Sequence, residues 1–415
     1  MKYVIEGGNK VFGKVKIQSA KNSVLSLISA SVLSSEEVFI ENCPNIYDVE
    51  CMLKIIKKLG ARVKWADGGI YIDPTKINST CICDKLSKKI RASLFLVGPL
   101  LGKFGAVTIN QTGGCDIGSR PLDIHIDALE KLGASVEAYD DCLYFHADKL
   151  KGNFVRLKYP SVGATENAMM CATLSCGVSV IENCAKEPEV VDLQRFLNKM
   201  GAKIQGAGTS CIRIEGVKCL HGCSFKPIPD RIETGTFMLL VATLGGELEI
   251  NGIKPENILF LAEKLRNNAC KISLYNDIIY IRVNNNLKGL GEIVTAPYPG
   301  FPTDLQPLAC ACALSCDEET VIKETIFENR FKYAEELLKL NANLEISGNT
   351  LRARKSELVG STVYAPDLRG GASLCIAGLY AEGVTVVENA EVVERGYENF
   401  DKKLKAIGAK IIKKK

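Results

Sequence analysis

A short motif of an apolar residue, glycine and alanine recurs along the chain and constrains its fold more than any other feature. Clear copies are Leu59-Gly60-Ala61 and Leu132-Gly133-Ala134. Further copies, two of them weakened, are Met200-Gly201-Ala202, Asn267-Asn268-Ala269, Leu340-Asn341-Ala342 and Ile407-Gly408-Ala409. The central residues of successive copies lie 67 to 73 positions apart. Such a regular period predicts six copies of one folding unit.

The first copy shows the pattern of the unit. An apolar helix is expected over residues 20–33 and a strand over 37–42. An amphipathic second helix follows, with Asp48 as its expected cap. Gly60 should end this helix in the left-handed conformation. Alternating residues around Asp67-Gly68-Gly69 then predict a hairpin.

The later copies repeat this order, which predicts an α/β fold. Their strands after the first helix are expected at Ala106–Asn110, Val178–Asn183, Glu247–Asn251, Thr320–Glu324 and Val384–Asn389. The sixth copy stops at Lys410–Lys413, one strand short, and we expect the N-terminal strand Tyr3–Glu6 to complete it.

Three units in each domain place the two domain crossings near residues 20 and 229. Residues 1–20 and 229–415 would then form one discontinuous domain, and residues 21–228 the other. The proline-stiffened segment Lys226–Pro229 fits the second crossing.

Composition indicates a soluble globular protein without a nucleic-acid partner. The chain has 415 residues, is 47% hydrophobic, and carries 52 basic against 48 acidic residues. This charge balance does not favour nucleic-acid binding. No apolar run is long enough for a membrane span, and no signal peptide is recognised at the N-terminus, so we expect a cytoplasmic protein. Most of its 17 cysteines should then be free thiols.

A metal site is the main alternative for the cysteines. Cys219 and Cys223 are four residues apart, but no second pair stands at zinc-ligand spacing. The three histidines, His125, His146 and His221, form no ligand motif. We therefore expect no metal.

The first helix of each copy is apolar nearly all round but carries polar residues near its start. Simple capping explains part of this pattern. Lys and Arg do not cap a helix N-terminus, however, because the helix dipole disfavours cations there. Lys21, Arg91 and Arg369 are therefore predicted to face an anionic ligand.

The segment 110–125 holds a candidate reactive thiol. Cys115 lies among Gly113, Gly114 and Gly118, and Arg120 follows five residues later. Glycines suit a loop that approaches a ligand, and a nearby guanidinium favours a thiolate. The alternative is a glycine-rich surface turn that contains an incidental cysteine.

These features together resemble the enolpyruvyl transferases over essentially the whole chain. The matching segments are Ser19–Asn22, Arg91–Ser93, Gly113–Pro121, Ser161–Thr165, Glu187–Glu189, Pro229–Thr236, Phe301–Asp304, Glu328–Phe331, Asp367–Arg369 and Arg395–Tyr397. The resemblance implies an inverse α/β barrel of two domains, each with three βαβαββ repeats and the site between them.

Within this family the chain is similar to the branch that acts on UDP-N-acetylglucosamine. The resemblance implies transfer of the enolpyruvyl group of phosphoenolpyruvate to the 3′-hydroxyl of that sugar nucleotide, with release of phosphate. This reaction is the first committed step of peptidoglycan synthesis. The implied partners are these two substrates, and no cofactor is implied.

The resemblance also assigns residues to the reaction. Cys115 would be the general acid and Asp304 the base, and Lys21, Asn22 and Arg395 complete the catalytic set. The residues assigned to phosphoenolpyruvate are Lys21, Asn22, Arg120, Arg369 and Arg395. The residues assigned to UDP-N-acetylglucosamine are Arg91, Arg120, Pro121, Leu122, Asp123, Ile124, Tyr159, Ser161, Val162, Gly163, Asp304 and Ile326.

Several residues have open assignments or depart from the family pattern. Asp304 could instead be a helix cap, and Arg330 could brace the domains or contact substrate. Tyr47 and Tyr159 stand where some members carry lysine.

Two alternative functions are kept open. One is the sister reaction on shikimate 3-phosphate, a branch expected to lack the Gly-Gly-Cys loop. The other is a catalytically weak paralogue that binds the sugar nucleotide and regulates partners.

Overall fold

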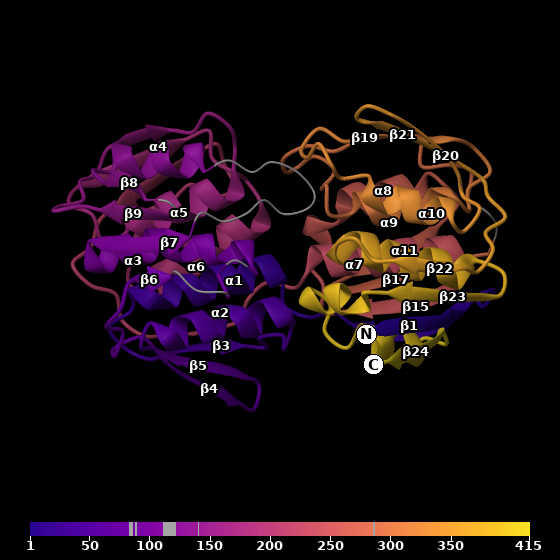
Figure 1. Ribbon diagram of the computed structural model, residues 1–415, viewed down its shortest axis with the longest axis horizontal. Helices are drawn as coiled ribbons and strands as arrows, with labels where there is room; N and C mark the ends of the chain where they lie inside the picture. Colours follow the sequence, from indigo (N-terminus) through magenta and orange to yellow (C-terminus); the bar gives the residue numbers. More distant parts are fainter. Residues whose placement is uncertain (83–85, 88, 111–121, 140, 285–286) are drawn as a thin grey trace. The chain divides into compact units, whose positions relative to one another are not determined.

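A computed structural model describes residues 1–415 except 83–85, 88, 111–121, 140 and 285–286 (Figure 1). The described chain divides into two compact units. Unit 1 contains Met1–Gln18 and Pro229–Lys415, and unit 2 contains most of the residues between Ser19 and Ile228.

Unit 2 alternates helices with short strands. Its helices are α1 (Lys21–Ala30), α2 (Tyr47–Lys58), α3 (Val97–Phe104), α4 (Asp123–Lys131), α5 (Val162–Ala172) and α6 (Pro188–Lys199), with 3₁₀ turns η1 (Ser31–Leu33) and η2 (Arg91–Leu96). Its strands are β3 (Val38–Glu41), β4 (Arg62–Ala66), β5 (Gly69–Asp73), β6 (Cys81–Ile82), β7 (Ala106–Asn110), β8 (Ser135–Tyr139), β9 (Cys142–His146), β10 (Phe154–Arg156), β11 (Val178–Glu182), β12 (Lys203–Gln205), β13 (Cys211–Glu215) and β14 (Ser224–Phe225).

Unit 1 follows the same order after two N-terminal strands. Its helices are α7 (Arg231–Leu244), α8 (Leu259–Arg266), α9 (Gln306–Ala313), α10 (Lys332–Leu338), α11 (Leu368–Tyr380) and α12 (Phe400–Ala406), with 3₁₀ turns η3 (Pro255–Asn257) and η4 (Ala390–Arg395). Its strands are β1 (Lys2–Glu6), β2 (Val11–Lys16), β15 (Gly246–Asn251), β16 (Lys271–Tyr275), β17 (Ile278–Val283), β18 (Glu292–Val294), β19 (Thr320–Lys323), β20 (Asn343–Ser347), β21 (Thr350–Arg354), β22 (Thr362–Tyr364), β23 (Val384–Glu388) and β24 (Lys410–Lys414).

The strands within the described ranges form six four-stranded sheets, which confirms the predicted repeats. In the sheet β10-β11-β13-β12, β10 runs parallel to β11, and the β12–β13 hairpin pairs antiparallel beside it. The other sheets have the same order of one parallel and two antiparallel pairs, but in β22-β23-β1-β24 the paired strands β1 and β24 come from opposite ends of the sequence and form no hairpin.

Three sheets are completed by strands distant in sequence. β1 pairs antiparallel with both β23 and β24, so the prediction that Tyr3–Glu6 completes the sixth copy is confirmed. β2 pairs parallel with β15, and β14 pairs parallel with β3. These last two pairings were not predicted.

The strand and helix ends show which local predictions hold. The predicted strands 37–42, 178–183 and 384–389 each end one residue early, because Asn42, Asn183 and Asn389 adopt positive φ angles of 49°, 56° and 54°. Gly60 has a φ of 113° and ends α2 as predicted. In the weakened fourth copy the left-handed residue is Ala269, one position after the expected centre.

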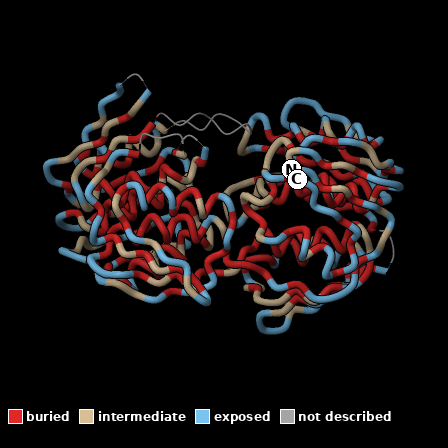
Figure 2. Tube along the Cα trace, turned by 60° about the horizontal axis from the view of Figure 1, so that its bottom comes forward, coloured by how far each residue is buried: buried red, intermediate tan, exposed pale blue. Residues whose placement is uncertain are grey.

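Each unit has its own hydrophobic core. In unit 1 the buried helices α7, α9 and α11 pack on one another, and in unit 2 α3 packs on α5 while α1 packs on η2 and α6. Buried segments form the interior of each unit, and exposed ones form its outer strands and turns (Figure 2). The buried helix α1 begins at Lys21, and α11 carries Arg369 in its first turn, so these two helices position part of the candidate site.

Candidate active site

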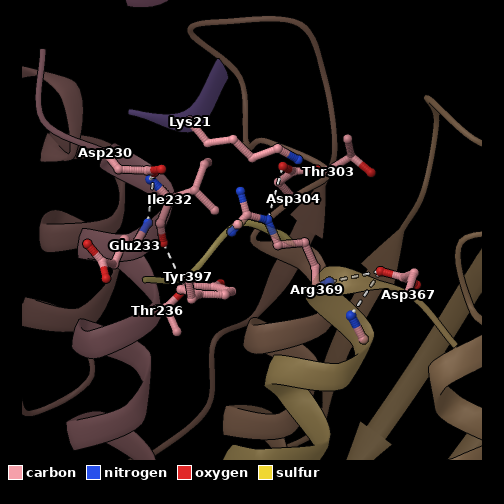
Figure 3. Close-up of polar contacts among 12 residues, drawn as sticks. Lys21, Asp230, Ile232, Glu233, Thr236, Thr303, Asp304, Asp367, Arg369 and Tyr397 are labelled. Carbon is pink, nitrogen blue, oxygen red and sulfur yellow. Dashed lines mark hydrogen bonds and ion pairs between the residues drawn. The ribbon is translucent and has the colours of Figure 1, made fainter. Parts of the chain in front are cut away.

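In unit 1 the carboxylate of Asp304 lies between two buried guanidinium groups. Arg369 Nε is 3.1 Å from Asp304 Oδ2 (Figure 3). Arg330 Nη2 is 3.2 Å from Asp304 Oδ1. The arginine side chains are at most 3% exposed, whereas that of Asp304 is 30% exposed. Asp304 is therefore the most exposed side chain of this cluster.

Local structure places these groups. Asp367 is the N-cap of α11, where its carboxylate accepts hydrogen bonds from the Arg369 and Gly370 amides at 2.9 and 3.0 Å. This cap fixes Arg369 in the first turn of the helix. Asp304 is not the N-cap of the next helix, because α9 begins at Gln306 with Leu305 as its N-cap. The alternative assignment of Asp304 as a helix cap is therefore wrong.

The buried carboxylate of Glu324 organises two loops beside this cluster. It accepts hydrogen bonds from the Thr303 hydroxyl at 2.9 Å and from the Ile326 and Phe327 amides at 2.8 and 3.2 Å. It thereby joins the residue before Asp304 to the turn that presents Ile326. Sequence reasoning missed Glu324, because a glutamate at a strand end has no distinctive signal.

Arg369 keeps its charge and has an unused donor. Burial alone would lower its pKa, but Tyr397 and the Asp304 carboxylate raise the pKa above its ordinary value on balance. The guanidinium carbon lies 5.0 Å from the Tyr397 ring centroid. Its Nη1 atom is buried without a hydrogen-bond partner among the described residues. A buried, charged donor without a partner fits an anionic ligand.

Arg395 is the last residue of η4 and is half-buried. It immediately precedes Gly396 and Tyr397, so the chain that carries it continues directly to the ring beside Arg369. Two predicted phosphoenolpyruvate ligands of unit 1, Arg369 and Arg395, are thus linked through Tyr397.

In unit 2, Lys21 begins α1 and pairs with the buried Asp48 at 2.9 Å. The prediction that Asp48 caps α2 is wrong, since α2 begins at Tyr47 with Ile46 as its N-cap and no side-chain cap bond. Asp48 instead provides the counter-charge for Lys21, which explains a lysine at a helix N-terminus. Asn22, the next residue of α1, is exposed.

Arg91 does not begin an α-helix as expected. It opens the 3₁₀ turn η2, and α3 starts only at Val97. Near it lies His125, whose pKa is lowered to about 4 by burial and by the Arg91 charge, against an opposing effect of Asp123.

His125 connects several predicted sugar-nucleotide residues. Its Nδ1 atom lies 3.1 Å from Asn167 Nδ2, which can only donate, so the ring proton belongs on Nε2. A Cβ atom at Gly163 would lie 3.3 Å from His125 Nε2. His125 is not among the predicted site residues, because the three histidines form no metal-ligand motif. Its place one residue after the predicted 120–124 segment was the available signal.

The other predicted sugar-nucleotide residues lie at the starts of two helices. Ser161 is the N-cap of α5 and accepts a hydrogen bond from the Ala164 amide. Tyr159 before it is 41% exposed. The remaining ones are Val162 and Gly163 in the first turn of α5, Leu122 as the N-cap of α4, and Asp123 and Ile124 in its first turn.

Three predicted site residues, Cys115, Arg120 and Pro121, lie outside the described residues. Among the rest, the structure brings Asp304, Arg369 and Arg330 together in unit 1, and it brings Arg91 and Gly163 to His125 in unit 2. Lys21 and Asn22 belong to unit 2. In the part of the chain that is described, no group of three or more metal-ligating side chains could hold an ion, and no helix is long and apolar enough to cross a membrane.

Comparison with known proteins places this arrangement in a family. The family model of EPSP synthase (3-phosphoshikimate 1-carboxyvinyltransferase) matches residues 5–404. The enolpyruvyl transferase NikO of Streptomyces tendae superposes with a TM-score of 0.89 over 99% of this chain and 98% of that one, at 24% identity. EPSP synthase of Acinetobacter baumannii superposes with a TM-score of 0.76 over 99% of both chains, at 16% identity. The chain belongs to the EPSP synthase family and has the two-domain enolpyruvyl transferase fold.

Closer relatives share one name. UDP-N-acetylglucosamine 1-carboxyvinyltransferase 2 of Caldanaerobacter subterraneus is 43% identical over 99% of both chains. UDP-N-acetylglucosamine 1-carboxyvinyltransferase 3 of the same organism is 44% identical, and the second such protein of Clostridium tetani is 43% identical, each over 99% of both chains.

Proposed function

We propose that this chain is a UDP-N-acetylglucosamine 1-carboxyvinyltransferase. It transfers the enolpyruvyl group of phosphoenolpyruvate to the 3′-hydroxyl of UDP-N-acetylglucosamine and releases phosphate. Full-length identity of 43–44% to relatives of that name carries the proposal. The buried, partly unpaired guanidinium of Arg369 beside Asp304 supports it, because phosphoenolpyruvate is an anion and the acceptor hydroxyl needs a base.

In the proposed reaction, the 3′-oxygen bonds to C2 of phosphoenolpyruvate while a proton is added to C3. Asp304 takes the proton from the hydroxyl, and Cys115 delivers the proton to C3. Loss of a proton from C3 and departure of phosphate from C2 then restore the double bond. The partial exposure of Asp304 supports its role, since a base must reach the substrate.

Substrate binding is proposed to use both units. The two domains would be residues 1–20 with 229–415, and residues 21–228. Phosphoenolpyruvate would bind to Lys21, Asn22, Arg120, Arg369 and Arg395. The sugar nucleotide would bind to Arg91, Arg120–Ile124, Tyr159, Ser161–Gly163, Asp304 and Ile326, and we add His125 to this set because it contacts their elements.

The relatives' name also supports a place in peptidoglycan synthesis, at its first committed step, and hence a role in cell shape and division. We place the protein in the cytoplasm. The 15 cysteines described are all free thiols, which fits a reducing compartment.

Steady-state phosphate release tests the proposal. We expect release with phosphoenolpyruvate and UDP-N-acetylglucosamine, and none when shikimate 3-phosphate replaces the sugar nucleotide. Release only with shikimate 3-phosphate would establish the sister reaction, and binding of the sugar nucleotide without release would establish a regulatory paralogue. Either result would overturn the proposal.

The proposed acid is tested at Cys115 itself. Cys115→Ser should nearly abolish turnover, whereas Cys115→Asp should retain part of it, because a carboxylic acid still donates a proton. Fosfomycin, an epoxide that mimics phosphoenolpyruvate, should add one adduct mass at Cys115. An adduct on another cysteine, or equal rates in the two variants, would contradict the assignment.

A further inference from the structure

The side chain of Gln18 holds the backbone on both sides of Tyr397. Gln18 Nε2 donates to the Gly396 carbonyl at 2.8 Å, and Gln18 Oε1 accepts from the Glu398 amide at 2.8 Å. Gln18 itself is only 8% exposed, and its own amide donates to Glu233 at 2.8 Å. One buried amide side chain therefore fixes a three-residue segment about 380 positions away in the sequence.

The Tyr397 side chain is held equally firmly. Its hydroxyl lies 2.7 Å from Thr236 Oγ1, and the Thr236 hydroxyl donates to the Ile232 carbonyl at 2.8 Å (Figure 3). Because Thr236 uses its only proton there, Tyr397 donates to Thr236. The ring also packs on Phe400, with centroids 4.8 Å apart. Backbone, ring and hydroxyl of Tyr397 are thus all constrained.

This ring supports the Arg369 guanidinium. The guanidinium carbon is 5.0 Å from the ring centroid, a separation at which the ring face attracts a cation. Asp304 holds Arg369 through Nε on one side, and Nη1 remains unused. Without the ring, the guanidinium would be oriented mainly by Asp304. The proposed role of Asp304 is to take the proton of the 3′-hydroxyl, which would change its charge during the reaction.

We propose that Gln18 and Tyr397 are positioning residues for phosphoenolpyruvate binding. Gln18 fixes the segment Gly396–Glu398, Tyr397 in that segment fixes the Arg369 guanidinium, and Arg369 then presents Nη1 to the anion. The same segment follows Arg395 directly, so Gln18 also holds the chain that carries a second cation. This inference rests on the proposed function, because it concerns how that substrate is bound.

The alternative is that Gln18 and Tyr397 serve only the stability of unit 1. A purely structural role would affect both substrates alike and would lower the thermal midpoint. A positioning role acts through Arg369 and should affect one substrate. The two roles are therefore separated by comparing KM for phosphoenolpyruvate with KM for the sugar nucleotide.

The experiment uses Tyr397→Phe, which keeps the ring but removes the hydroxyl anchor, and Gln18→Met, which keeps the shape but removes the clamp. Tyr380→Phe is the matched control, since Tyr380 is partly buried at the opposite end of α11 from Arg369. We expect KM for phosphoenolpyruvate to rise about tenfold in both variants, equivalent to ~1.4 kcal/mol. KM for the sugar nucleotide should stay within about twofold, and the control should match the wild type.

The double variant Gln18→Met/Tyr397→Phe tests whether the two residues act in series. If Gln18 acts through Tyr397, the combined rise in KM is clearly smaller than the product of the single effects. If the variants show an unchanged KM for phosphoenolpyruvate, or equal rises in KM for both substrates, the inference is refuted. The proposed function is still supported in that case, provided that the wild-type protein turns over both substrates. A wild-type protein without turnover would refute both.

Discussion

Glu166 on α5 is a fully buried carboxyl group, and its ionisation should make unit 2 less stable as pH rises. It is 0% exposed, and both of its carboxyl oxygens are buried. Burial, and then the charges of Glu189 and Glu187, raise its pKa well above the ordinary value, against an opposing effect of the Ser26 hydroxyl. The folded protein therefore holds a proton that the unfolded chain releases at much lower pH.

The sign and size of the effect follow from linkage. Below the unfolded pKa of about 4.3, both states are protonated and the contribution of Glu166 to stability is fully present. Above it, the folded state binds more protons, so the free energy of unfolding falls by up to ~1.4 kcal/mol per pH unit. The fall stops once pH exceeds the folded pKa.

Glu166→Gln removes this dependence because an amide does not ionise in this range. Its buried NH₂ group adds a constant offset of about 1–3 kcal/mol, so the informative quantity is the slope against pH. Urea unfolding at pH 5, 6, 7 and 8 can be followed by Trp65, the only tryptophan of the chain, which lies on β4 in unit 2. We expect the wild type to lose stability relative to the variant as pH rises.

The matched control is Glu130→Gln, which removes a carboxylate from an exposed position on α4 in the same unit. This control should leave the slope of the wild type nearly unchanged. If the difference in unfolding free energy between wild type and Glu166→Gln does not change with pH, then the folded protein does not hold a proton on Glu166, and the reasoning from burial fails.

Three further changes test the candidate site. Asp304→Asn should lower turnover at least about 10²-fold while phosphoenolpyruvate binding by calorimetry persists, because the base is lost but Arg369 remains; near-normal turnover would exclude Asp304 as the base. Gly163→Ala would place a Cβ atom 3.0 Å from His125 Cε1, so KM for the sugar nucleotide should rise several-fold, and an unchanged KM would show that this contact is irrelevant. Asp230 is the N-cap of α7, and its carboxylate accepts hydrogen bonds from two backbone amides. Asp230→Ala should therefore lower the free energy of unfolding by about 1 kcal/mol. A loss smaller than the error of urea titration would contradict that role.

The repeats and their sheets could be predicted because they depend on local periodicity. The role of Tyr3–Glu6 could be predicted because the sixth copy is one strand short. The pairing of β14 with β3 could not be predicted. Its two residues, Ser224 and Phe225, are too few to show alternation, and their partner lies almost two hundred positions away. Short edge strands have no sequence signal of their own.

Part of the candidate site, too, could be predicted from the sequence, and part of it could not. A lysine at a helix start is unusual and can be recognised from the sequence. Its partner Asp48 is predicted to be a cap instead, because an aspartate before an apolar stripe has that role in many helices. His125 and Gln18 act through contacts that join segments distant in sequence. Such contacts depend on tertiary packing, so residue type and spacing gave no indication of them.

The place of β1 inside the last sheet has a consequence for synthesis on the ribosome. β1 leaves the ribosome long before its partners β23 and β24, which begin at residues 384 and 410. At roughly 10 residues per second, this strand waits roughly 40 seconds without its ladder partners. Unit 2, whose strands pair among residues 38–225, can close during that time. A nascent chain therefore carries an unpaired strand beside a finished domain, and this interval is when chaperone protection of the N-terminal segment matters most.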